Sequence, residues 1–99
     1  MNIVWLPRAQ ANRTHAIDYI AKENPRAALD QLGEIEQQSD MLADHPEIGR
    51  VGRRRGTREL VINRTPFILV YRVRSRAKRV EILRLLHGPV GPKLRFWPS

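Results

Sequence analysis

The chain has no cysteine among its 99 residues. This absence excludes a disulfide framework and any metal site built from thiolates. No apolar run approaches the roughly 20 residues of a membrane-spanning helix, and the first ten residues, MNIVWLPRAQ, lack the charged start, apolar stretch and cleavage site of a secretory signal. We therefore expect a cytoplasmic protein that binds no membrane and forms one domain over residues 1–99, because a chain of this length supports one modest core.

Side chains for nucleophilic or metal chemistry are also scarce. The serines and histidines lie far apart in the sequence, without the spacing of metal ligands or of a nucleophile and its base. They are Ser39, Ser75, Ser99, His15, His45 and His87. We therefore expect neither a metal ion nor a cofactor. Phe, Tyr and Trp occur only twice each and do not alternate with basic residues as on a base-stacking surface, which weighs against a module that only binds nucleic acid.

Charge is plentiful and is divided unevenly along the chain. The formal net charge is +8. Residues 1–49 contain four Lys or Arg and eight Asp or Glu, whereas residues 50–99 contain fourteen and two. A basic second half of this kind favours a polyanionic partner, either a nucleic acid or an acidic protein segment.

Apolar spacing and capping residues predict an α+β fold. Asn24 followed by Pro25 combines a helix cap with a first helical residue, so a second helix restarts there. The glycine- and arginine-rich segment 46–59 is predicted to be a loop or a loosely held edge. The expected elements are a strand over 2–5, helices over 8–23 and 25–43, strands over 60–62, 67–73 and 80–86, and an extended tail over 88–99. This β-α-α-β-β-β order predicts a helical hairpin packed on one face of a mainly antiparallel sheet.

Two patterns predict which side chains face the core. Leu29, Leu32 and Ile35 form a stripe on the second helix that we expect to pack on alternate residues of the two long strands. In the last strand, plain alternation places Arg84 on the same face as the residues two positions away. That face holds Ile82 and Leu86, and the other holds Glu81, Leu83, Leu85 and His87. The sequence does not indicate which of the two faces meets the helices.

Four short runs resemble one protein family. They are LVYRV over 69–73, RELV over 58–61, HPEIGR over 45–50 and ILRLLHG over 82–88. Together with the order of elements and the basic second half, these runs resemble the RelE/ParE superfamily of bacterial toxins from toxin-antitoxin systems along most of the chain. The resemblance implies the fold expected above and one of two activities.

The first activity belongs to RelE-like members, which cut messenger RNA on the ribosome. In these members an arginine stands directly before the LVY run and two lysines lie on the preceding strand, where cations stabilise charge on the scissile phosphate. The corresponding positions here hold Ile68, Glu59 and Val61. An alternative catalytic set consists of Arg58, Arg84 and His87, the last near the catalytic histidine of the YoeB-like branch and suited to act as an acid or base.

The missing cations favour the ParE-like branch, whose members poison DNA gyrase by binding it without catalysis. The resemblance therefore implies a gyrase-inhibiting toxin with no catalytic residues, and it implies the ribosome and messenger RNA as partners only under the alternative. Aromatic side chains dominate the energetics of many interfaces. Phe96 and Trp97 in the tail are accordingly candidate gyrase contacts.

The resemblance also implies a cognate antitoxin, which we expect to be of the ribbon-helix-helix type. Antitoxins of this family wrap a C-terminal segment, often acidic, around the toxin, so a hetero-oligomer is expected. A basic half suits such a segment and would speed the encounter. The residues that we expect to bind the antitoxin are Arg53, Arg54, Arg55, Arg58, Arg72 and Arg84.

Overall fold

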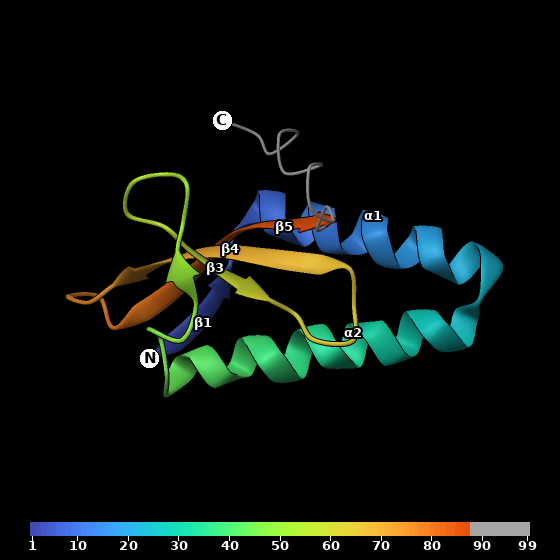
Figure 1. The fold of residues 1–99 in the computed structure, drawn as a ribbon, viewed down its shortest axis with the longest axis horizontal. Helices are drawn as coiled ribbons and strands as arrows, with labels where there is room; N and C mark the ends of the chain where they lie inside the picture. Colours follow the sequence, from blue (N-terminus) through green and yellow to red (C-terminus); the bar gives the residue numbers. More distant parts are fainter. Residues whose placement is uncertain (88–99) are drawn as a thin grey trace.

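A five-stranded sheet carries a two-helix hairpin on one face in the computed structural model of the protein, which describes residues 1–87 (Figure 1). The elements are β1 (Asn2–Trp5), α1 (Pro7–Glu23), α2 (Pro25–Asp40), the 3₁₀ turn η1 (Met41–Ala43), β2 (Arg50–Val51), β3 (Arg58–Val61), β4 (Phe67–Arg74) and β5 (Arg79–His87). The expected α+β fold is confirmed. The tail predicted over 88–99, with Phe96 and Trp97, lies outside the described residues.

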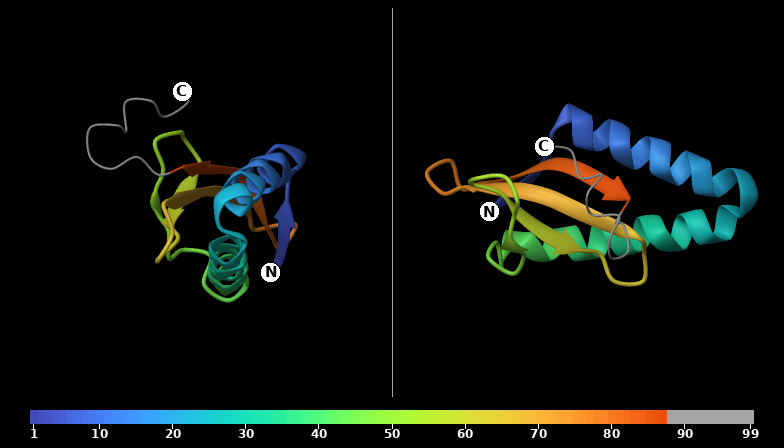
Figure 2. Two further views of the ribbon diagram at one scale, coloured as in Figure 1. Left: turned by 90° about the vertical axis from the view of Figure 1, so that its right-hand side faces the viewer. Right: turned by 45° about the horizontal axis from the view of Figure 1, so that its top comes forward.

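The sheet has the order β1-β5-β4-β3-β2. β1 runs parallel to β5, and each of the other neighbouring pairs is antiparallel. Both helices lie on the same side of the sheet (Figure 2). The short edge strand β2 falls inside the segment expected to be a loop or a loosely held edge, and its position could not be predicted because a two-residue strand has no detectable period. The opposite side of the sheet is covered by neither helix (Figure 2), and we call it the helix-free face.

Asn24 ends the first helix and starts the second, as expected. Its backbone N–H donates to the carbonyl oxygen of Ile20 at 2.9 Å, and its side-chain oxygen accepts from the N–H of Ala27 at 3.0 Å. Pro25 then occupies the first helical position, where its missing N–H costs nothing. The prediction that two helices meet here is confirmed. No helix within residues 1–87 is both long and apolar enough to cross a membrane.

The stripe predicted on α2 is only partly correct. Ile35 is fully buried in the core together with Leu42, whereas Leu32 is half-buried and Leu29 is 67% exposed. The reason is geometric: the turn that joins the helices extends past the ends of the strands, so the first part of α2 has no sheet beneath it (Figure 1). The placement of Leu29 against the sheet was therefore wrong.

A β-bulge in β5 overturns the plain alternation expected for Arg84. Val70 pairs with Arg84 and Tyr71 pairs with Ile82, which leaves Leu83 as an extra residue. Ile82 lies in the core on the helix side, and Arg84 lines a groove on the helix-free face. The same shift corrects the other half of the expectation, because Leu85 belongs to the core while Leu83 faces the groove.

Tyr71 fastens the segment that leads from the helices to β2. Its hydroxyl donates to the carbonyl oxygen of Pro46 at 2.7 Å and accepts from the N–H of Gly49 at 2.9 Å. Burial raises the pKa of the Tyr71 hydroxyl, which keeps it protonated as a donor. A Cβ on Gly49 would lie 2.6 Å from the Tyr71 hydroxyl oxygen, so only glycine fits there. This anchor positions the arginine-rich loop that follows.

Candidate functional site

A groove of about 450 Å³ opens on the helix-free face of the sheet. Its apolar lining comes from the start of α1 and from the middle of β4 and β5, and three arginines stand around it. We call it the arginine groove; its lining residues are Leu6, Pro7, Arg8, Arg54, Thr57, Val70, Leu83, Arg84 and Leu86. An apolar floor with cations at its margin suits a partner segment that carries both apolar and acidic side chains.

Three separate parts of the chain bring the groove arginines together. The N–H of Leu6 donates to the carbonyl oxygen of Ile82 at 3.0 Å, which sets the start of α1, and hence Arg8, beside the bulge of β5. Arg54 comes from the loop between β2 and β3, where the Thr57 hydroxyl donates to its carbonyl oxygen at 2.6 Å. Sequence spacing alone would not have joined residues this far apart.

Arg84 is held in the bulge by a contact from α1. The Asn12 side-chain oxygen accepts from the Nε of Arg84 at 3.1 Å and from the N–H of Leu85 at 3.2 Å. Partial burial lowers the pKa of Arg84, and the nearby charges of Arg8 and Arg54 lower it further. Like charges therefore converge at this point of the surface.

No acidic side chain within residues 1–87 balances these charges. The ion pairs between described residues involve Glu34, Glu59 and Glu81, and none of them includes a groove arginine. Repulsion among three cations beside an apolar surface costs free energy that a bound carboxylate would relieve. The arginine groove is thus an unbalanced cationic site in the free protein.

Next to the groove, one buried carboxylate gathers three further arginines. Glu81 is 5% exposed and accepts from the Nε of Arg72 at 2.6 Å, of Arg79 at 2.7 Å and of Arg74 at 3.3 Å. Hydrogen bonds from Arg72 and then from Arg79 lower the pKa of Glu81 from its ordinary value of 4.5 to about 2, against the opposing effect of burial. We call these four residues the Glu81 cluster.

The depressed pKa of Glu81 predicts a pH dependence of stability. A carboxylate whose folded-state pKa is lowered stabilises the fold above its unfolded-state pKa, and this contribution is lost as pH falls through the folded-state value. The difference in unfolding free energy between the wild type and Glu81→Gln should therefore be largest near neutral pH and should shrink as pH falls from 4.5 toward about 2. Denaturant titrations across this range measure it.

Glu36→Gln provides the control for this comparison, because Glu36 is exposed on α2 and forms no ion pair within residues 1–87. Its difference from the wild type should change little over the same pH range. If the wild-type and Glu81→Gln curves stayed parallel down to pH 2, the ionised Glu81 would contribute nothing to stability.

The positions at which the ribonuclease branch carries cations are neutral or acidic here. Ile68 is 5% exposed, Val61 is half-exposed and Glu59 is 3% exposed. Glu59 accepts from the guanidinium of Arg50 at 3.1 Å and from the backbone N–H of Arg53 at 3.1 Å, so its carboxylate fixes the β2–β3 loop. These side chains are part of the sheet and of the contacts that hold its loop. None of them carries a positive charge, so none can stabilise a phosphate anion.

The alternative catalytic residues lie in three different surroundings. Arg58 turns back and donates to the carbonyl oxygens of Gly49 at 2.8 Å and Glu47 at 3.3 Å. Arg84 lines the arginine groove, whereas His87 packs edge-on against Phe67 and lines a separate cavity beside α1. These different surroundings mean that the structure does not bring Arg58, Arg84 and His87 to one reaction centre. Separately, residues 1–87 contain no cluster of three potential metal-ligating side chains.

The arginines expected to bind an antitoxin fall into separate groups. Arg54 and Arg84 line the arginine groove, Arg53 and Arg55 lie exposed in the adjoining loop, and Arg72 belongs to the Glu81 cluster. The remaining one, Arg58, uses its side chain to hold loop carbonyl groups. The groove therefore collects two of the six, next to two more in the same loop.

Two features of this face were not predicted from the sequence: the position of Arg8 in the groove and the role of Glu81 in binding three arginines. Arg8 reaches the groove only through the parallel pairing of β1 with β5, for which the sequence has no local signal. Glu81 had a readable signal, because Glu59 and Glu81 are the only acidic residues of the basic second half. Glu59 and Glu81 are both buried and bound by arginines, as isolated carboxylates among cations are expected to be.

Comparisons with known proteins agree on one family. The protein-family model described as "ParE toxin of type II toxin-antitoxin system, parDE" matches residues 3–89. "Putative toxin Y4kP" from Sinorhizobium fredii is 39% identical over 86 residues, covering 87% of this chain and 86% of that protein. "Toxin RelE2" from Caulobacter vibrioides is 35% identical over 86 residues, covering 87% of this chain and 93% of that protein.

A solved structure shows the same fold. The match is to a chain of the "Chromosomal ParDE TA system from P. aeruginosa", with a TM-score of 0.79 and 27% sequence identity. It covers 90% of this chain and 97% of that chain. The similarity therefore extends over nearly the whole length of both proteins.

Proposed function

The chain belongs to the ParE toxin family and is a toxin of a type II toxin-antitoxin system, and from this premise we propose that it inhibits DNA gyrase by binding it. In this proposal the toxin performs no catalysis of its own. It acts in the cytoplasm and is neutralised there in a hetero-oligomer with a cognate antitoxin, for which a ribbon-helix-helix protein is the proposed type.

The observation that carries this proposal is the chemistry at positions 59, 61 and 68. Cleavage of RNA needs preorganised cations where negative charge develops on the phosphate. Here those positions hold two aliphatic side chains, Val61 and Ile68, and the carboxylate of Glu59, which is already bound by Arg50 and by the backbone N–H of Arg53. A toxin built on this sheet without those cations is better suited to block a protein target than to cut a message.

We propose that the antitoxin binds along the arginine groove. The groove combines an apolar floor with three arginines that have no acidic partner within residues 1–87. An acidic segment with apolar side chains would fill the floor and relieve the repulsion among the cations. This electrostatic match would also speed association at low salt.

A ribosome-dependent endoribonuclease is the second candidate function. It is favoured by the name of one relative, "Toxin RelE2", and by the presence of His87 at the end of β5. The two functions separate when purified protein is added in parallel to a gyrase supercoiling reaction and to ribosomes translating a defined message. We expect loss of supercoiling with the message intact; cleavage of the message with supercoiling unaffected would replace the gyrase proposal.

Replacing His87 by Gln tests the catalytic alternative directly. A general acid or base is typically worth 10²-fold or more in rate, so a ribonuclease relying on His87 would lose about that factor. We expect growth inhibition on induced expression to be unchanged, because His87 packs against Phe67 and lies away from the groove arginines. His15→Gln is the matched control, since His15 lines the same cavity. A loss confined to the His87 variant would contradict the proposal.

A further inference from the structure

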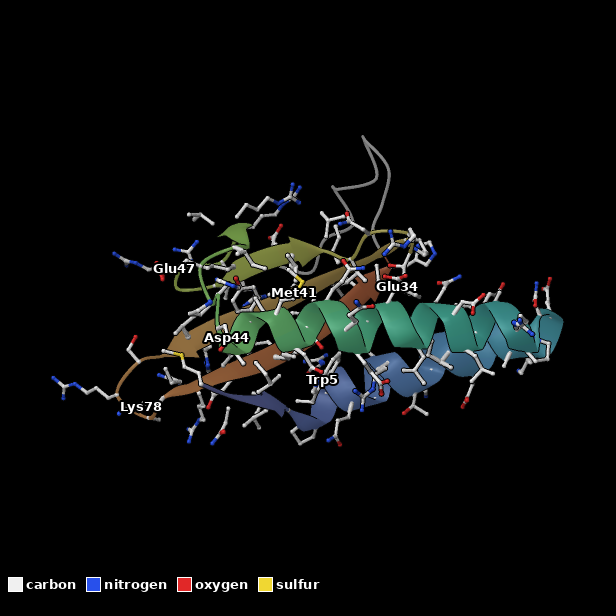
Figure 3. All side chains as sticks on the ribbon, turned by 90° about the horizontal axis from the view of Figure 1, so that it is seen from below. Trp5, Glu34, Met41, Asp44, Glu47 and Lys78 are labelled. Carbon is white, nitrogen blue, oxygen red and sulfur yellow. The ribbon has the colours of Figure 1, made fainter. Side chains whose placement is uncertain are left out.

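The tip of the β4–β5 hairpin is the most basic short segment that the structure describes. Five cationic side chains fall within eight residues, namely Arg72, Arg74, Arg76, Lys78 and Arg79. The tip projects beyond the sheet, at the end opposite to the turn between the helices, with Lys78 at its extremity (Figures 1 and 3). We call residues 72–79 the basic hairpin. None of its residues lines the arginine groove.

The arginines at the base of this hairpin are held in place rather than free to rotate. Glu81 binds Arg72, Arg74 and Arg79 through their Nε atoms, and their terminal Nη groups make no hydrogen bond within residues 1–87. The three side chains remain 37%, 51% and 46% exposed, whereas that of Glu81 is 6% exposed. A buried carboxylate thus orients three guanidinium groups whose outer donors face solvent.

This arrangement leaves positive charge uncompensated. One carboxylate serves three guanidinium groups, and Arg74 stands directly opposite Arg79 in the register of β4 and β5. Like charges directly opposite each other destabilise an antiparallel pair. Arg76 and Lys78 add further positive charge at the tip, and neither forms an ion pair within residues 1–87. A bound polyanion would offset the repulsion that the fold itself leaves in place.

We propose that the basic hairpin binds the phosphate backbone of a nucleic acid, with Arg72, Arg74 and Arg79 as phosphate ligands and Glu81 as the positioning residue. Guanidinium groups bind phosphate with two parallel hydrogen bonds, so fixed Nη donors are suited to this contact. Arg72 and Arg74 are two residues apart on one face of β4, a separation of ~7 Å. Neighbouring arginines can therefore contact neighbouring phosphates of one strand.

The composition of the hairpin favours a nucleic acid over a protein partner. Protein interfaces are stabilised by buried aromatic or aliphatic side chains, and the exposed residues at the tip, 74–79, contain no side chain of that kind larger than Ala77. No aromatic residue stands within the exposed tip to stack on a base. We therefore expect binding that is independent of sequence and directed at the backbone. Duplex DNA is the expected source of the phosphates, because the proposed target works on DNA.

The choice of DNA rests on the proposed function, whereas the inference that the hairpin binds a phosphate backbone does not require gyrase to be the target. A toxin that failed to inhibit gyrase would still bind a phosphate backbone if the Glu81 cluster is built for it. Conversely, gyrase inhibition without any nucleic-acid affinity would leave the proposed function intact and overturn this inference. Failure of the gyrase proposal can therefore be distinguished from failure of the nucleic-acid proposal.

Fluorescence anisotropy of the full chain with a short labelled DNA duplex tests the proposal, and a labelled RNA duplex of the same sequence forms the second arm. Arg79→Ala should weaken DNA binding about tenfold, and it should reduce the slope of log affinity against log salt by about 0.9 if one phosphate contact is lost. Arg76→Ala, which removes the same charge outside the Glu81 cluster, should have a clearly smaller effect. Tighter binding in the RNA arm, with the same order of variants, would assign the phosphates to RNA.

Glu81→Gln distinguishes organised arginines from simple positive charge. The variant raises the net charge by one, so charge alone would make it bind DNA more tightly. Loss of the positioning carboxylate should instead weaken binding several-fold, and Arg79→Lys, which keeps the charge and loses the planar fork, should do the same. A thermal melt establishes that each variant is folded. Tighter binding by Glu81→Gln, or equal effects of Arg79→Ala and Arg76→Ala, would overturn the proposal.

Discussion

A toxin carrying Arg54→Glu and Arg84→Glu should bind its cognate antitoxin about 10³-fold more weakly than the wild type. Placing two carboxylates where the groove now has two guanidinium groups replaces attraction by repulsion against an acidic segment, and such changes cost several kcal/mol in a desolvated interface. The groove arginines have no acidic partner within residues 1–87, so no intramolecular ion pair is broken. Titration calorimetry with purified antitoxin measures the loss.

Two further variants make this result interpretable. Arg84 also donates to Asn12, so the pair Arg8→Glu and Arg54→Glu repeats the charge reversal in the groove without disturbing that contact. Lys22→Glu combined with Arg26→Glu makes the same change in net charge at exposed positions of α1 and α2, outside the groove lining and outside the residues expected to bind the antitoxin. An equal loss in this control pair would show that net charge, and not the groove, sets antitoxin affinity.

Association kinetics add a second measurement on the same proteins. Long-range attraction between a basic toxin and an acidic segment is screened by salt, with a Debye length of about 8 Å at physiological ionic strength. The groove variants should therefore associate more slowly at low salt and should show a flatter dependence on salt. A wild-type association rate that did not change with salt would mean that these arginines do not steer the encounter.

Local signals predicted the parts of the fold that depend on neighbouring residues. Asn24 and Pro25 specify a cap and a helix start within a few residues, and the structure has both. The strands over 67–73 and 80–86 were also located correctly, because each is a run rich in strand-forming residues that is bounded by turn residues. What the sequence could not supply was the register between distant segments.

The bulge at Leu83 shows why this mattered for the candidate site. Alternation assumes that every residue advances the pleat by one step, and a single extra residue moves all later side chains of β5 to the other face. Nothing in the run ILRLLHG marks the position of that extra residue. The location of Arg84 beside Arg8 and Arg54 therefore follows from tertiary pairing, and the groove was not predictable from the sequence.

Replacing Ile35 by Ala should lower the free energy of unfolding by about 2–5 kcal/mol, the usual cost of truncating a fully buried aliphatic side chain. Ile35 has no exposed surface and lies in the core together with Leu42, Ile62 and Tyr71. A domain of this size has only ~5–15 kcal/mol of stability, so the variant should be close to unfolding at moderate temperature. Denaturant melts monitored by circular dichroism measure the change.

Leu29→Ala is the matched control, because Leu29 lies on the same helix and is 67% exposed. It should cost less than ~0.5 kcal/mol, as surface substitutions generally do. The contrast depends on α2 lying on the sheet only along its second part. If both variants cost the same amount, α2 would have to pack along its whole length, and the stripe expected from the sequence would be correct after all. A cost confined to Ile35→Ala would instead establish the geometry in which the helices extend beyond the sheet.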